Sequence, residues 1–185
     1  MTGTAQATAD HGFLREAVEL SRRCPPSDSA FSVGAILVGP DGAVIATGYS
    51  RELNPRDHAE EVALAKAGAL PGSDRPGPGE QAGAGATGPA GTGVTAGAAD
   101  GGGVLGGATM YTSLEPCRRR LSRTRSCAEL IVAAGIGRVV LAWREPPLFV
   151  PGGGADWLRE QGVTVQEMPA LAGAARAVNA HLLPR

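Results

Sequence analysis

The stretch YTSLEPCRRRLSRTRSC, at residues 111–127, carries two of the three cysteines of this chain and follows HAE at residues 58–60. It begins inside a run, residues 108–113, that predicts a strand. It ends where residues 126–134 predict a helix that Gly135 terminates. Two cysteines, Cys117 and Cys127, therefore lie between the end of a strand and the start of a helix.

His58, Cys117 and Cys127 supply one imidazole and two thiolates, which favour one zinc ion per chain over magnesium or calcium. Catalytic zinc sites commonly have three protein ligands and a water in the fourth position, whose pKa the metal lowers towards neutrality. Glu60 lies in the same helical turn as His58, where its carboxylate can take a proton from that water and pass it on. Because a helix turns about 100° per residue, only one of Glu60 and Glu61 can face the metal.

The order His-x-Glu, then Pro-Cys-x-x-Cys, is the signature of zinc-dependent nucleobase deaminases, in which the glutamate is not a ligand. His58-Ala59-Glu60 and Pro116-Cys117 match that signature. The second cysteine departs from it, because residues 118–126 separate Cys117 from Cys127. These residues must loop out before Cys127 returns to the metal.

The chain resembles the deaminases of the riboflavin pathway, bacterial and especially fungal, which also carry a long loop between the two cysteines. The likeness covers most of residues 11–166 and skips a Gly/Ala-rich insert. The matching stretches are AFSVGA at 30–35, TGYSREL at 47–53, HAE at 58–60, YTSLEPC at 111–117, RLS at 120–122 and REPPLFV at 144–150.

This resemblance implies an α/β fold of the cytidine deaminase type, a three-layer α/β/α sandwich around a mixed sheet of about five strands. It implies a hydrolase that acts on the C–N bond of a pyrimidine-type heterocycle, a diaminopyrimidinone with a ribosylamino or ribitylamino phosphate arm. In that reaction a zinc-bound hydroxide attacks the amino-bearing carbon, Glu60 moves the protons and ammonia leaves. The resemblance also implies a homodimer or a higher homo-oligomer.

Two other functions stay open at this point. A deaminase of the same fold could act on another base or nucleotide, such as cytosine, guanine, deoxycytidylate or a tRNA adenosine. A non-catalytic zinc module that binds a partner is the third possibility. Glu60 argues against the module, because structural zinc sites are usually closed by four protein ligands.

The cysteine loop is rich in arginine, and arginine offers bidentate donors to phosphate. We expect substrate contacts from this loop and from two segments nearer the N-terminus, although a solvated charged loop is the plain alternative. The expected contacts are Arg51, Asn54, Ser32, Arg120 and Arg123.

Hydrophobic periodicity places further elements around these motifs and predicts alternating strands and helices. The expected strands are 31–38 and 43–49, which form a hairpin, then 138–143 and 163–166. The expected helices are 11–23, 58–70, 155–161 and 171–183.

The 185 residues, with a formal net charge of -1, are expected to form one domain over 11–185 after a flexible tail at 1–10. Residues 71–107 are rich in Gly and Ala and lack the large apolar side chains that would offset their ordering entropy, so we expect a flexible insert. Near-neutral charge argues against nucleic-acid binding. No apolar run reaches the roughly 20 residues that cross a bilayer, and no signal peptide is visible, so a cytoplasmic location is expected.

Overall fold

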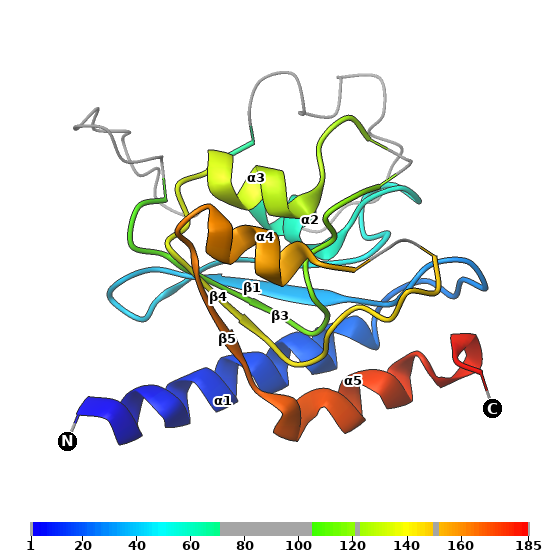
Figure 1. Cartoon of the computed structure of the whole chain (residues 1–185), viewed down its shortest axis with the longest axis horizontal. Helices are drawn as coiled ribbons and strands as arrows, with labels where there is room; N and C mark the ends of the chain where they lie inside the picture. The colour runs from blue at the N-terminus through cyan, green and yellow to red at the C-terminus, as the bar shows by residue number, and fades with distance from the viewer. Residues whose placement is uncertain (1, 71–104, 121–122, 150–151, 185) are drawn as a thin grey trace, which may run out of the picture.

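The computed structural model describes residues 2–70, 105–120, 123–149 and 152–184, in which one sheet lies between two layers of helices (Figure 1). The strands are β1 (Gly34–Val38), β2 (Val44–Tyr49), β3 (Thr109–Thr112), β4 (Arg138–Leu141) and β5 (Thr164–Glu167). The helices are α1 (Thr2–Ser21), α2 (Ala59–Lys66), α3 (Cys127–Ala133), α4 (Gly154–Glu160), α5 (Ala172–Val178) and the 3-10 turns η2 (Pro169–Leu171) and η3 (Ala180–Leu182).

The sheet has five strands in the order β2-β1-β3-β4-β5. Strand β1 runs antiparallel to β2 and β3, whereas β3, β4 and β5 run parallel to one another. Helices α1 and α5 cover one face, and α2, α3 and α4 cover the other (Figure 1). The expected three-layer sandwich with a mixed five-stranded sheet is confirmed.

Two glycines let the helices lie directly on the sheet. A Cβ atom on Gly34 of β1 would overlap the carbonyl oxygen of Ala17 in α1, and one on Gly48 of β2 would overlap that of Ala59 in α2. Any larger side chain there would push the helix away from the strand. Gly48 therefore fixes how closely the start of α2 approaches β2.

The N-terminal segment differs from the expected tail, because residues 2–10 form the first half of α1. Asp10 is buried and accepts hydrogen bonds from Tyr111 of β3 and Arg138 of β4. The alanines of this segment favour a helix, but its apolar stripe begins only at Phe13, so hydrophobic periodicity placed the helix start too late.

The predicted insert at 71–107 lies mostly outside the described residues. Its last three residues are described and form a turn, with Leu105 buried and its N–H donated to Ala134. Residues 105–107 therefore differ from the flexible insert that the composition indicated.

The C-terminal helix is shorter than expected, since 3-10 turns flank α5 on both sides. The buried Asn179 ends α5, and its side chain accepts from the Ser32 N–H and donates to the Ser32 carbonyl. This pair of hydrogen bonds ties the C-terminal segment to the start of β1. Among the described residues, no helix has the length and apolarity that a transmembrane span requires.

Candidate active site

Three element ends carry the predicted metal ligands. His58 is the N-cap of α2, Cys117 follows β3, and Cys127 is the first residue of α3. A capping box fixes the start of α3, because the Ser126 hydroxyl accepts from the Glu129 N–H and the Glu129 carboxylate accepts from the Ser126 N–H. The helix start places the Cys127 thiol beside the other two side chains.

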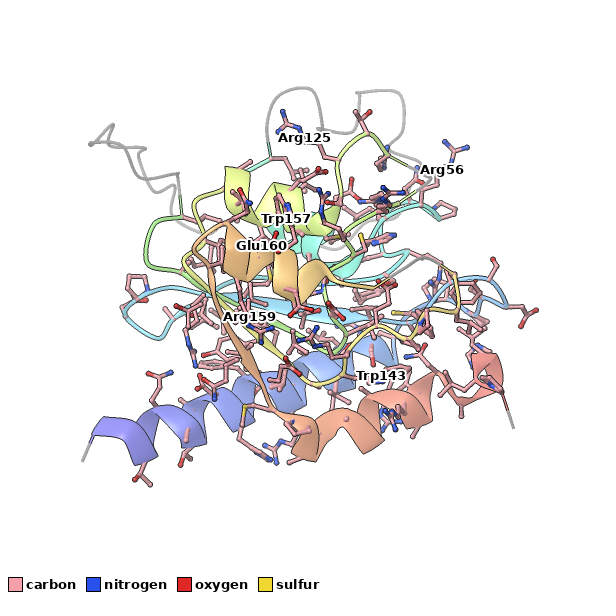
Figure 2. The ribbon with its side chains drawn as sticks, viewed as in Figure 1. Arg56, Arg125, Trp143, Trp157, Arg159 and Glu160 are labelled. Carbon is pink, nitrogen blue, oxygen red and sulfur yellow. The ribbon has the colours of Figure 1, made fainter. Side chains whose placement is uncertain are left out.

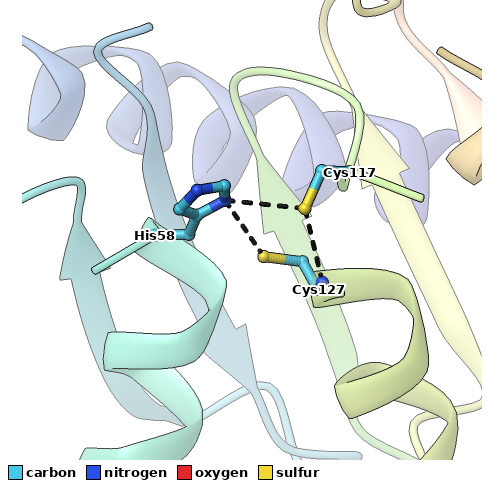
Figure 3. Close-up of side chains that lie close together, drawn as sticks. All are labelled: His58, Cys117 and Cys127. Atoms are coloured by element: carbon cyan, nitrogen blue, oxygen red, sulfur yellow. Dashed lines mark hydrogen bonds between the residues drawn. The ribbon is translucent and has the colours of Figure 1, made fainter. Parts of the chain in front are cut away.

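The potential ligand atoms of His58, Cys117 and Cys127 all lie within 4.8 Å of one another (Figure 3). His58 Nδ1 is 3.6 Å from Cys117 Sγ and 3.4 Å from Cys127 Sγ. A tetrahedral zinc with ordinary Zn–N and Zn–S lengths separates its nitrogen and sulfur ligands by about 3.6 Å. The observed spacing and the donor set therefore fit a zinc ion with three protein ligands.

The pKa values of the two buried thiols, Cys117 and Cys127, are shifted in opposite directions. Hydrogen bonding from Cys127, supported by His58, lowers the pKa of the Cys117 thiol to about 4. The same contact, together with burial, raises the pKa of the Cys127 thiol. These opposite shifts favour the thiolate on Cys117 and the thiol on Cys127, and a metal ion would replace the proton on the second sulfur.

Glu60 is fully buried in the first turn of α2. Burial raises the pKa of the Glu60 carboxyl above its ordinary value. The Thr112 hydroxyl of β3 lies 3.0 Å from Glu60 Oε1 and 2.9 Å from the Leu114 carbonyl oxygen. Burial therefore disfavours the ionised form of Glu60, and one hydroxyl orients its carboxyl group.

A cavity of about 280 Å³ opens beside these groups. Phe31 and Phe149 form an apolar wall, with ring centroids 5.1 Å apart and edges turned towards faces. His58, Glu60 and Cys117 line the same cavity. The remaining lining residues are Ser29, Ala30, Val33, Ser50, Arg51, Pro55, Arg56, Asp57, Leu114, Glu115, Arg119, Arg120 and Glu145.

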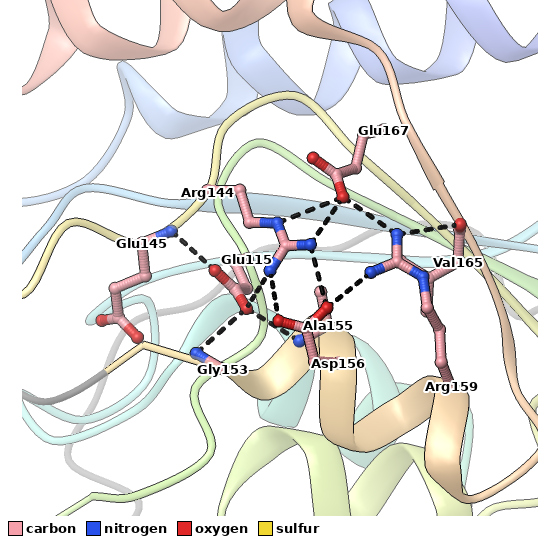
Figure 4. A network of polar contacts seen from close by, with 9 residues as sticks. All are labelled: Glu115, Arg144, Glu145, Gly153, Ala155, Asp156, Arg159, Val165 and Glu167. Atoms are coloured by element: carbon pink, nitrogen blue, oxygen red, sulfur yellow. Dashed lines mark hydrogen bonds and ion pairs between the residues drawn. The ribbon is translucent and has the colours of Figure 1, made fainter.

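Two acidic residues of the cavity wall, Glu115 and Glu145, had no chemical role assigned to them from the sequence. Glu115 is buried, and its carboxylate accepts from the N–H groups of Glu145, Gly153 and Ala155 (Figure 4). Burial, with the nearby charge of Cys117, raises the pKa of the Glu145 carboxyl to about 8. Glu145 occurs within the stretch REPPLFV, but its burial depends on contacts that the sequence does not show.

The predicted contacts Arg120 and Arg123 are both held by acids. Arg120, with 2% of its side chain exposed, donates to Glu61 at 2.9 Å and to the Arg56 carbonyl at 2.8 Å. Arg123 pairs with Asp57 at 2.8 Å and with Glu61 at 3.2 Å. Arg120 lines the cavity, whereas Arg123 is not among its lining residues.

The other predicted contacts lie around the loop before α2. Arg51 has φ of 63° and donates to the carbonyls of Pro25 and Phe31 and to the Ser32 hydroxyl. Asn54 accepts from the Arg56 N–H through its side chain. Arg51 lines the cavity, but Ser32 and Asn54 are not among its lining residues.

Comparison with known proteins places this geometry in a family. The zinc-binding region of cytidine and deoxycytidylate deaminases matches residues 7–143. A diaminohydroxyphosphoribosylamino-pyrimidine deaminase of Schizosaccharomyces pombe is 35% identical over 155 residues, covering 84% of this chain and 31% of the relative. The riboflavin biosynthesis protein RibD of Aquifex aeolicus is 31% identical over 134 residues, covering 72% of this chain and 27% of the relative. The chain thus spans about a third of the length of these curated relatives.

Solved structures agree with the fold. A Thermotoga maritima diaminohydroxyphosphoribosylaminopyrimidine deaminase and 5-amino-6-(5-phosphoribosylamino)uracil reductase has a TM-score of 0.63 at 26% identity, covering 92% of this chain and 39% of that one. An Aspergillus oryzae Rib2 deaminase has a TM-score of 0.64 at 26% identity, covering 93% and 97%. The resemblance to riboflavin-pathway deaminases is confirmed, and the chain belongs to the zinc-binding cytidine and deoxycytidylate deaminase family.

Proposed function

We propose that this chain is a zinc-dependent hydrolase that removes an amino group from a diaminopyrimidinone with a phosphorylated ribosylamino or ribitylamino arm. The observation that carries the proposal is the meeting of His58, Cys117 and Cys127 within 4.8 Å, beside a cavity that Glu60 also lines. The printed names of the relatives from S. pombe and A. aeolicus support the substrate class.

His58 Nδ1 and the sulfurs of Cys117 and Cys127 would hold the metal. Zinc bound there supplies Lewis acidity and a water of lowered pKa. Three protein ligands leave a fourth position, as hydrolytic catalysis needs.

Glu60 would move the protons. A hydroxyl has a single proton, so Thr112 can donate it either to the ionised Glu60 or to the Leu114 carbonyl. When Glu60 is protonated, Thr112 can donate to Leu114 and accept from Glu60. Thr112 can therefore form a hydrogen bond with Glu60 in both protonation states without a change of geometry. A group that carries a proton from water to the ring nitrogen and the leaving amine needs this property.

The cavity wall would hold the heterocycle between aromatic side chains. Phe31 and Phe149 offer apolar surface, and Arg51 keeps the segment that carries Phe31 in place through its carbonyl. Among the contacts expected from the sequence, Arg51 and Arg120 are proposed as parts of the wall. Ser32, Asn54 and Arg123 are proposed as supports of the loops behind it.

Assembly and location are also proposals. We propose a homodimer or higher homo-oligomer from the resemblance to the riboflavin-pathway deaminases, and we keep the cytoplasmic location as the expectation stated from the sequence pattern. Sedimentation of the purified protein would test the first, and fractionation of the source cell the second.

The deciding experiment measures ammonia release from zinc-loaded protein. The panel contains the phosphorylated diaminopyrimidinone, its dephosphorylated form, cytosine, guanine, deoxycytidylate and a tRNA substrate. Glu60→Gln, loaded with the same amount of zinc, is the control. Release from the diaminopyrimidinone that disappears in the control is expected.

Two other outcomes would change the proposal. Release from an ordinary base or nucleotide alone would keep the reaction and discard the riboflavin substrate. An intact zinc content with no release from any compound, and no effect of Glu60→Gln in cells, would favour a non-catalytic zinc module.

A further inference from the structure

The charged residues that line the cavity differ in whether their side chains have hydrogen-bond or ion-pair partners within the protein. Two of its arginines, Arg51 and Arg120, are partly or largely buried and donate to carbonyl groups or to Glu61. Among its acids, Asp57 is paired with Arg123, and Glu115 accepts three backbone N–H groups. These groups stabilise the walls through fixed partners.

Arg56 and Arg119 are different. Both line the cavity, and both side chains are exposed. Neither guanidinium forms a hydrogen bond or ion pair with any residue in the described ranges, and Arg56 lies at the periphery of the molecule (Figure 2). The two groups thus offer donors to a ligand without first breaking a contact within the protein.

The two arginines belong to loops that are joined. Arg120, the neighbour of Arg119, donates to the carbonyl oxygen of Arg56 at 2.8 Å. This bond brings the loop before α2 and the loop after Cys117 together at the cavity. Each of the two loops contributes one exposed arginine to the lining of the same cavity.

In contrast to the two exposed arginines, Glu60 and Cys117 form a buried part of the same cavity. Its volume of about 280 Å³ lies at the lower end of ligand pockets, which run from roughly 300 to 1,000 Å³. A ring that reaches the buried end would therefore extend a sugar-phosphate arm towards the rim. Guanidinium groups bind phosphate oxygens through paired N–H donors.

We propose that Arg56 and Arg119 form the subsite for the phosphate group of the substrate, in place of the Arg120 and Arg123 that the sequence suggested. This assignment rests on the proposed function, because it requires a substrate with an anionic arm. It makes the two exposed arginines specificity-determining residues.

The test measures binding apart from turnover. Zinc-loaded Glu60→Gln protein is titrated by calorimetry with the phosphorylated diaminopyrimidinone and with its dephosphorylated form. Adding Arg56→Gln and Arg119→Gln is expected to weaken binding of the phosphorylated compound about ten- to hundredfold, since charge-assisted hydrogen bonds are lost. The preference for the phosphorylated compound should fall by the same factor and lose its dependence on salt.

Arg15→Gln with Arg22→Gln is the matched control, because it removes the same charge from two exposed positions, one in α1 and one directly after it, that do not line the cavity. This control should keep the preference for the phosphorylated compound. Equal binding of the two compounds by the parent protein, or an equal loss of both in the double variant, would overturn the subsite. Absence of ammonia release is a separate result: it would remove the proposed function while phosphate-dependent binding could still support the subsite.

Discussion

Two charged clusters lie on opposite faces of strand β3, and they differ in how the buried carboxylate is satisfied. Tyr111 contacts Asp10 of α1, whereas the next residue, Thr112, contacts Glu60 of α2. Burial would raise the pKa of Asp10, but hydrogen bonds from Arg138, Gln6 and Tyr111 lower it below the ordinary value. Burial raises the pKa of Glu60, which has no such guanidinium partner among the described residues.

The difference separates a structural carboxylate from a reactive one. A carboxylate held ionised by an arginine stabilises the fold and gives up its proton too readily to be a proton carrier near neutral pH. A buried carboxyl without that partner is costly to ionise, and proteins place such groups where a proton must move. The cluster on the α1 face therefore stabilises the fold, while the cluster on the α2 face suits catalysis.

Removing a metal ligand should have the largest effect on the α2 face. In Cys127→Ser the soft thiolate is replaced by a hydroxyl, so zinc content measured by elemental analysis should fall and ammonia release should be lost. Cys24→Ser, which changes a cysteine outside the metal group, is the control and should keep one zinc per chain. Full zinc content in Cys127→Ser would contradict the proposed ligand set.

Glu60→Gln should lower kcat about 10²- to 10⁴-fold, the usual contribution of a general acid–base group. The amide fills the same space and needs no counter-charge, so the urea midpoint should change little. Kinetics and urea unfolding of the same preparation check both expectations. A large loss of stability with little loss of kcat would reverse the roles of the two clusters.

Asp10→Asn should give the opposite pattern. It leaves the Arg138 guanidinium, with 22% of its side chain exposed, without its carboxylate, so unfolding should become easier by about 2–3 kcal/mol. The value of kcat for the remaining folded protein should stay near that of the parent. Urea unfolding at pH 7, paired with kinetics below the transition, measures both.

The pH dependence of stability gives a further test of whether Asp10 is held in its ionised form. Because the folded pKa of Asp10 is lowered from 3.8, its contribution is present above about pH 4 and is lost as pH falls through the folded pKa. Parent protein should therefore lose stability below pH 4 more steeply than Asp10→Asn does. Identical slopes for the two proteins would mean that Asp10 is not held ionised by its partners.

A smaller effect is expected from Glu61, which accepts from the His58 N–H and pairs with Arg120 and Arg123. Glu61→Gln should weaken zinc binding about tenfold, the lower end of what supporting residues contribute around metal ligands. Competition with a chelator measures the affinity. Glu16→Gln, at an exposed position of α1, is the control, and an equal loss in both variants would exclude this supporting role.

The sequence predicted the elements and the ligand set because their signals are local. His58-Ala59-Glu60 and Pro116-Cys117 are short motifs, and their neighbouring strands and helices have clear periodicity. Tyr111 and Arg138, which bind Asp10, and Arg56 and Glu61, which bind Arg120, lie 59 or more positions away along the chain and carry no such signal. For the same reason the sequence selected Arg120 and Arg123 from the arginine-rich loop as substrate contacts, whereas both pair with acids on or beside α2 and Arg119 does not.

The alternation of Tyr111 and Thr112 on β3 also bears on errors during folding. A slip of one residue in the pairing of β3 would exchange the two side chains between the faces of the sheet. The slipped chain would bury a phenol against Glu60 and lose both the Asp10 contact and the Thr112 hydroxyl. The same pairing of β1, β3 and β4 that disfavours this misfolded form also places the Thr112 hydroxyl against Glu60, so one strand register serves both the stability of the fold and the orientation of the buried carboxyl group.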